Sequence, residues 1–154
     1  MSNKKIKKWI FTAVVFLLLC FGGFWLLFRA SGITPDTAIN SFTKHQESYE
    51  DTAKYFVKKK IVTEVTGFRT IDNNYGIDYE DSEDFRKMAE GLDHLISVGI
   101  EKIQSDGKNV CFVLPASGGM LNKEHAEILY CKDTPIPGYT PLGYEHWYYA
   151  IKSE

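Results

Sequence analysis

Five oxygen-bearing side chains between residues 72 and 83 have the spacing of a calcium-binding loop. Asp72, Asn74, Asp78, Glu80 and Glu83 occupy positions 1, 3, 7, 9 and 12 of that template. The template also needs glycine at position 6 for its sharp turn, and Ile77 stands there. The segment before the run is typical of a strand rather than a helix. We therefore predict an acidic loop leading into a helix N-terminus, where carboxylates are favourable, and no metal site.

The histidines and the serine of a glycine-containing loop show no catalytic pattern. The four histidines are His45, His94, His125 and His146. No two of them are four residues apart and none pairs with cysteine at zinc-finger spacing, although a zinc site assembled from distant residues stays open. Ser117 lacks the G-x-S-x-G motif, and a triad with His125 and Asp133 has no more support than other selections. We predict no catalytic residue, no cofactor and no enzymatic activity.

Cys111 and Cys131 are candidates for a disulfide. They flank a loop at residues 116–125 that is expected to join two antiparallel strands. Pairing Phe112 with Tyr130 places Cys111 opposite Cys131 with both sulfurs on one face. An extracytoplasmic compartment permits the bond, and closing this loop would contribute about 3 kcal/mol. Two ordinary buried thiols are the alternative, because cysteine often behaves as a small apolar residue.

An aromatic cluster near the C-terminus is the candidate binding surface. Its members are Tyr139, Tyr144, Trp147, Tyr148 and Tyr149, which lie among three prolines. Aromatic side chains supply binding energy at interfaces and can stack on sugars or prolines. The alternative is that Trp147 and Tyr149 alternate into a core while Tyr139 and Tyr144 stand on a rigid loop.

An apolar run, Trp9–Phe28, positions everything that follows it. It has twenty residues and no charge, and a helix of that length spans the roughly 30 Å hydrocarbon core of a bilayer. It is longer than the apolar core of a signal peptide, and no A-x-A-like cleavage site follows it. Cys20 lacks the small preceding residue of a lipoprotein signal. We predict an uncleaved single-pass anchor in the lipid bilayer, with those two signals as alternatives.

Charge gives the anchor a direction. Four lysines precede it and only Arg29 follows closely, so the N-terminus is expected in the cytoplasm and the C-terminal domain outside the cell membrane. All 20 acidic residues follow the anchor, and 13 basic residues lie from residue 30 onward. The region from residue 30 to 154 therefore has a net charge near −7. An acidic domain argues against nucleic acid as a partner.

The chain divides into a basic tail (1–8), the anchor (9–28), a short tether (29–34) and one domain (35–154). Thr34-Pro35-Asp36 starts an amphipathic helix of about six or seven turns. A second helix follows a cap at Ser82 or Asp81 and ends near Gly99. Strands are predicted at 61–69, at 100–105 and 109–114 around an Asp106-Gly107 turn, at 126–132 and at 146–152.

The order α-β-α-β-β-β-β indicates an α+β domain with two helices packed on an antiparallel sheet. A long N-terminal helix cradled by a curved sheet, as in cystatin-like or NTF2-like folds, is one topology consistent with this order. We interpret the domain as a binding module for a protein or envelope partner at the membrane. The alternatives are an envelope enzyme whose site no motif reveals, and an immunity or inhibitor protein with an acidic binding surface.

Overall fold

The described part of the chain folds as three helices and an open, antiparallel sheet of six strands. The computed structural model describes residues 33–66, 77–115, 124–133 and 136–153. Within these ranges no helix has the length and apolar character needed to cross a bilayer. The predicted anchor at 9–28 lies outside the described residues. The α+β class is confirmed for the domain.

The sheet has the strand order β1-β2-β3-β4-β6-β5, with antiparallel neighbours throughout. Five strands correspond to the predicted ones, whereas the short β5 is an addition that no sequence pattern indicates. The predicted strand at 61–69 is described only as far as residue 66. The strands span Val62–Thr66 (β1), Lys102–Asp106 (β2), Asn109–Val113 (β3), Glu124–Cys131 (β4), Thr140–Pro141 (β5) and Trp147–Ser153 (β6).

The hairpin between β2 and β3 turns one residue later than the sequence predicts. Asp106 still belongs to β2, and Gly107 and Lys108 form the connection. Gly107 has a positive φ of 82°, a conformation that glycine adopts without steric cost. The Asp106 carboxylate closes the turn by accepting the backbone N–H groups of Lys108 at 2.8 Å and Asn109 at 2.6 Å.

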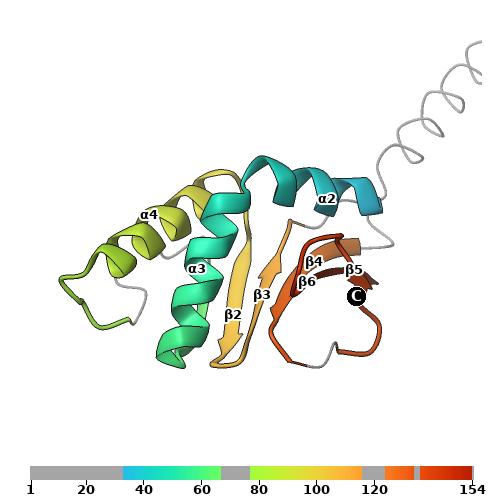
Figure 1. Cartoon of the computed structure of the whole chain (residues 1–154). Coiled ribbons are helices and arrows are strands. Elements are labelled where there is room, and N and C mark those ends of the chain that lie inside the picture. Colours follow the sequence, from blue (N-terminus) through green and yellow to red (C-terminus); the bar gives the residue numbers. More distant parts are fainter. Residues whose placement is uncertain (1–32, 67–76, 116–123, 134–135, 154) are drawn as a thin grey trace, which may run out of the picture.

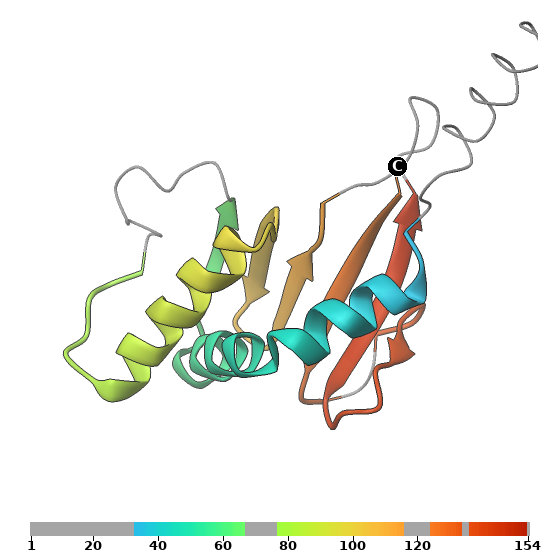
Figure 2. The ribbon, with the colours of Figure 1, turned by 90° about the horizontal axis from the view of Figure 1, so that it is seen from above.

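Two helices occupy the segment where the sequence pattern predicts one. Helix α2 spans Pro35–Lys44 and helix α3 spans Gln46–Lys59. The predicted start is confirmed, with Pro35 as the first helical residue. The prediction of one continuous helix was wrong, because His45 leaves the helical conformation (φ −124°, ψ 25°). The bend allows α2 to contact β4 and β6 while α3 contacts β3, so the pair follows the twisted sheet (Figures 1 and 2).

Helix α4 spans Glu83–Ser97 and packs along α3. The predicted cap is confirmed, since Ser82 Oγ accepts the backbone N–H of Phe85 at 3.2 Å. Gly99, with a φ of 100°, follows the helix end as predicted. At Gly91 the two helices approach so closely that an added Cβ would lie 3.0 Å from the backbone oxygen of Ser48.

The helices lie on one face of the sheet (Figure 2). Alternation along the strands places apolar side chains on this face. Trp147 is the centre of this core, with ring centroids 4.6 Å from Phe42 and 5.0 Å from Tyr130. Its side chain is 2% exposed. One row crosses five strands, with Val65, Ile103, Phe112 and Ile128 in the core and Tyr149 packed against it.

The predicted register between the two cysteine-bearing strands was wrong by two residues. Strands β3 and β4 pair Cys111 with Leu129 and Asn109 with Cys131. The two cysteines are therefore diagonal neighbours, about 7–8 Å apart, whereas a disulfide needs a Cβ separation near 3.8 Å. No bond joins the two sulfurs in the structure. The predicted pairing was centred on residue 121 of the connecting loop, whereas the observed pairing is centred on residue 120.

Candidate binding groove

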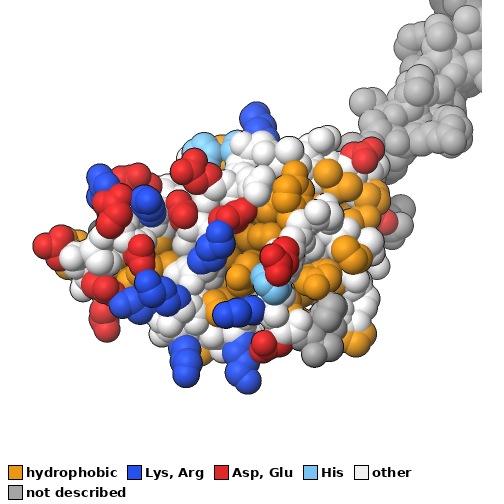
Figure 3. All heavy atoms as spheres, in the orientation of Figure 1, with side chains coloured by type: hydrophobic (Ala, Val, Ile, Leu, Met, Phe, Trp, Pro, Cys, Tyr) orange, Lys and Arg blue, Asp and Glu red, His pale blue; other side chains and the backbone are white. Residues whose placement is uncertain are grey.

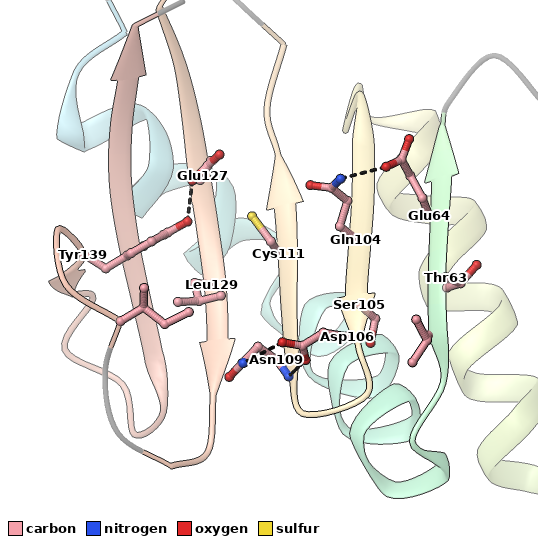
Figure 4. Close-up of a pocket in the computed structure, with 12 residues that line it drawn as sticks. Thr63, Glu64, Gln104, Ser105, Asp106, Asn109, Cys111, Glu127, Leu129 and Tyr139 are labelled. Atoms are coloured by element: carbon pink, nitrogen blue, oxygen red, sulfur yellow. Dashed lines mark hydrogen bonds between the residues drawn. The ribbon is translucent and has the colours of Figure 1, made fainter.

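A groove of about 600 Å³ runs over the sheet face that the helices leave open (Figure 4). Its floor is formed by side chains of β2, β3 and β4, among them Gln104, Cys111 and Leu129. One wall comes from β1, at Val62 and Glu64. The opposite wall is the chain that leads from β4 toward β5, which brings Ile136 and Tyr139 over the sheet.

A hydrogen bond to Glu127 on β4 holds the Tyr139 side chain in the groove wall opposite β1. The Tyr139 hydroxyl donates to Glu127 Oε2, and His125 Nε2 lies 3.3 Å from Glu127 Oε1. The side chains of His125 and Glu127 are only 16% and 17% exposed. Burial, followed by the bond to Glu127, raises the pKa of Tyr139 well above its ordinary value, so the phenol stays protonated and continues to donate. Lys152 Nζ lies 4.9 Å from the Tyr139 ring centroid.

Cys111 lies on the groove floor between the two walls (Figure 4). Burial, followed by the negative charge of Glu127, raises the pKa of the Cys111 thiol to about 12. A cysteine nucleophile must be a thiolate, and this thiol is protonated at neutral pH. Cys111 therefore contributes a small, neutral surface to the groove rather than a nucleophile.

The β1 wall is exposed and carries the charge of Glu64. Gln104 Nε2 donates to Glu64 Oε2 at 2.7 Å, and Val62 is 76% exposed. Asp106 lines the far end of the groove. Although burial opposes it, hydrogen bonds from Asn109 and Lys108 lower the pKa of Asp106, so this group is a carboxylate at neutral pH.

Three carboxylates line the groove, and its described lining contains no lysine or arginine. The three are Glu64, Asp106 and Glu127. Two lysines on this face lie beside the groove. Lys102 pairs with Val113 in the sheet register, and Lys152 pairs with His125. The described lining of the groove is therefore acidic, and Lys102 and Lys152 lie beside it.

The opposite face of the domain carries a mixed charge pattern instead of one acidic patch. Figure 3 shows basic and acidic side chains interleaved over α3 and α4. Several of them form ion pairs: Lys58 of α3 pairs with Asp84 of α4, and Lys59 of α3 pairs with Glu80 in the segment before α4, both at 2.6 Å. The negative net charge thus does not produce a uniform acidic surface on the helices.

The structure distributes the five aromatic residues of the predicted binding surface over both sides of the sheet. Trp147 lies in the core, and Tyr149 packs against the core. Tyr144 is 38% exposed and its ring lies 5.1 Å from that of Phe42. Tyr148 pairs with Leu129 and Pro141 in the sheet register. Only Tyr139 lines the groove.

The described members of the acidic run have partners that suit a loop before a helix. Glu80 accepts the Tyr55 hydroxyl at 3.0 Å and pairs with Lys59, while Glu83 pairs with Arg86. Asp72 and Asn74 lie outside the described residues, as does Ser117. In the described ranges no cluster of three or more histidine, cysteine or acidic side chains could hold a metal.

Sequence reasoning missed Glu127 as a groove residue. The predicted strand at 126–132 contained Glu127 but not His125, which lies on β4 in the structure and, two residues from Glu127, shares its face. Tyr139, in contrast, lies in a connection rich in proline and glycine. No periodicity there predicts which strand a side chain will contact.

Removing the Tyr139 hydroxyl is expected to lower the free energy of unfolding by about 1–3 kcal/mol, because a largely buried carboxylate loses a donor. The variant is Tyr139→Phe, which keeps the ring over the sheet. Urea unfolding of the full chain in detergent, followed by circular dichroism, measures the change. Tyr144→Phe is the matched control and should change the stability by less than about 0.5 kcal/mol. Equal stability of the two variants would contradict the role of the Tyr139–Glu127 bond.

Comparisons with protein families, with curated proteins and with solved structures found no match for this chain. The groove is accordingly the feature that carries a functional inference. It combines an exposed apolar edge, a neutral floor and three carboxylates. Such a surface is complementary to an extended segment with basic side chains.

Proposed function

We propose that this chain is a single-pass, membrane-anchored binding module whose acidic groove holds a basic, extended segment of an envelope protein. The anchor at 9–28 would place the N-terminus in the cytoplasm and the domain at 35–154 outside the cell membrane. The uncharged length of the anchor, the four lysines before it and the acidic excess after it support this placement.

The observation that carries the binding role is the charge of the groove lining. Glu64, Asp106 and Glu127 converge on one trough without a lysine or arginine in its described lining. The trough crosses the strands from β1 to β4. Three inter-strand spacings give it a length of about 14 Å in this direction, equal to roughly four residues of extended chain. Four residues with one or two basic side chains would match both its length and its charge.

A binding role is favoured over catalysis because the titratable groups of the groove are already engaged. The Glu127 carboxylate interacts with Tyr139 and His125, and Asp106 accepts three hydrogen bonds within its own turn. Cys111 is a protonated thiol. A general base or nucleophile needs a reactive form that faces the substrate, and this arrangement supplies none among the groove residues.

We also propose the cystatin-like or NTF2-like arrangement for the fold. Its support is the bent pair α2 and α3, which lies across one face of a twisted antiparallel sheet (Figure 1). The space between these helices and the sheet is filled by aromatic side chains, including Phe42, Tyr49 and Trp147. A ligand site on the open face is therefore independent of the helix-covered core.

Site-specific photo-crosslinking in the native membrane tests the groove. A photoreactive amino acid at Gln104, on the groove floor, should capture a protein partner through a peptide that contains lysine or arginine. Adding Glu64→Lys is expected to reduce this adduct about three- to tenfold, since it reverses an exposed charge at the wall.

Glu90→Lys is the matched control, because it makes the same charge change at an exposed position of α4, away from the groove. The Gln104 adduct should keep its full yield in this variant. A yield that falls equally in both variants would mean that net charge, not the groove, governs the interaction. Capture of a lipid, a glycan or an acidic peptide in place of a basic segment would refute the proposed partner.

A further inference from the structure

Two histidines that are 49 positions apart in the chain form a hydrogen bond where the three helices meet. His45 forms the bend between α2 and α3, and His94 lies in the last turn of α4. His45 Nδ1 and His94 Nε2 are 2.9 Å apart, and the ring centroids are 4.9 Å apart. The pair belongs neither to the hydrophobic core nor to the groove lining, so neither of these explains it.

This hydrogen bond joins the ends of helices that are distant in the chain. The His45 N–H donates to the carbonyl oxygens of Ser41 and Phe42, at 3.2 and 3.1 Å, and so ends α2. The His94 carbonyl oxygen accepts the N–H of Val98 at 3.0 Å, in the turn that leads from α4 toward β2. One side-chain contact therefore ties the exit of α4 to the bend between α2 and α3.

The packing of α3 on α4 keeps the two rings close to each other. Gly91 precedes His94 by three residues, and Ser48 follows His45 by three residues. An added Cβ at Gly91 would lie 3.0 Å from Ser48 O, so the two helix backbones are nearly in contact one turn away from the rings. A repulsion between the rings therefore acts on a junction that has no slack, and the rings separate only if they turn into solvent or if the end of α4 loosens.

Two of the three protonation states of an imidazole pair preserve its hydrogen bond. When both rings are neutral, one ring nitrogen donates and the other accepts, and when one ring is charged it donates to the neutral ring. When both rings are charged, every ring nitrogen carries a hydrogen and no acceptor remains between them. The second proton therefore breaks the contact and replaces it with repulsion between two positive charges.

The charges near the pair oppose the second proton. Burial, followed by the charges of His94 and of Lys44 at the end of α2, lowers the pKa of His45. The carboxylates within one turn of the pair along α3 and α4 are Glu47, Glu90 and Asp93. None of these three contributes to the shift, so no negative charge offsets a doubly charged pair.

The direction of this shift fixes the direction of the pH dependence. The folded state holds the His45 proton less tightly than the unfolded chain, in which the pKa of histidine is about 6.5. The stability that this group contributes is therefore fully present above about pH 6.5 and is lost as the pH falls toward the lowered pKa of the folded state. Acid thus weakens the junction, whereas alkali leaves it intact.

We propose that the His45–His94 hydrogen bond is an acid-sensitive latch, which holds the exit of α4 to the bend between α2 and α3 at neutral pH and releases it when both rings are charged. Release loosens the last turn of α4 and the turn that follows it. The domain is expected outside the cell membrane, where the pH follows the surroundings. This proposal stands apart from the groove, and failure of one leaves the other intact.

Amide hydrogen exchange of the full chain in detergent, followed by nuclear magnetic resonance, tests the latch. The N–H groups of Val98 and Ile100 report on the end of α4, because they donate to His94 O and Leu95 O, each at 3.0 Å. After correction for the intrinsic exchange rate, their protection should be about tenfold lower at a pH of about 5 than at a pH of about 7.5. Equal protection at the two pH values would overturn the proposal.

His94→Gln separates the latch from a merely structural contact, because glutamine can still donate to His45 but cannot become charged. Its protection near pH 7.5 should stay close to that of the wild type, and the acid-induced loss should shrink to about twofold or less. His45→Asn removes the other titrating ring, keeps a residue suited to a helix N-cap, and should suppress the loss in the same way.

His146→Gln is the matched control, because it makes the same substitution at a histidine outside the pair. It should keep the full loss of protection in acid. Circular dichroism near pH 7.5 checks that each variant is folded. A loss in both His94→Gln and His45→Asn as large as that of the wild type would assign the acid response to other groups and refute the latch.

Discussion

Replacing Trp147 with alanine is expected to lower the free energy of unfolding by about 3–5 kcal/mol, the range found when large aromatic residues are removed from cores. The indole is 2% exposed and contacts the rings of Phe42, Phe112 and Tyr130. Its removal leaves a cavity between helix α2 and the sheet that rigid neighbours cannot fill. Urea unfolding of the full chain, followed by far-ultraviolet circular dichroism, measures the loss.

Tyr79→Ala is the control for this substitution. Tyr79 is 78% exposed and contacts Phe85 at one edge, so its removal should cost about 1 kcal/mol or less. The comparison separates the two roles that the sequence allows for Trp147. A Trp147→Ala protein that kept wild-type stability while losing a binding partner would show that the indole serves recognition rather than the core.

Replacing Gly91 with valine is expected to lower the free energy of unfolding by about 3 kcal/mol, at the upper end for overpacked sites. The first added carbon would lie 3.0 Å from Ser48 O and 3.2 Å from Thr52 Oγ1. Ser48 O is a backbone atom, so α3 must shift as a whole to relieve the clash. The gain in helix propensity over glycine is only a few tenths of a kcal/mol and does not offset this cost.

Glu90→Val is the matched control, because the neighbouring residue is exposed on the same helix. It should cost only the loss of helix propensity, about 0.5 kcal/mol. Thermal unfolding of both variants in the same detergent gives the comparison. Equal midpoints for Gly91→Val and Glu90→Val would mean that α3 and α4 do not pack as closely as the structure shows.

The local elements were predictable because each depends on a few neighbouring residues. Ser82 caps α4, and Gly99 follows its end, for reasons that act within one helical turn. The alternation along the final strand likewise offered Trp147 and Tyr149 as core residues, and in the structure Trp147 lies in the core and Tyr149 packs against it. The boundaries of these elements moved by only a few residues between prediction and structure.

The long-range features were not predictable, because each depends on packing between distant segments. His45 continues the apolar spacing of a helix, and only the sheet beneath it explains the bend. The register of β3 on β4 depends on how many loop residues form the turn, which the sequence does not reveal. The meeting of His45 with His94 depends on the crossing of α3 and α4, and the position of Tyr139 depends on an irregular connection.

The place of Trp147 in the core also gives the domain an optical label. The sequence contains three tryptophans, of which Trp9 and Trp25 lie in the predicted anchor, so Trp147 is the single indole from residue 29 onward. A soluble fragment of the domain would thus emit from one buried fluorophore surrounded by tyrosines that can transfer excitation to it. A red shift of that emission would report loss of the contacts between α2 and the sheet without any added dye.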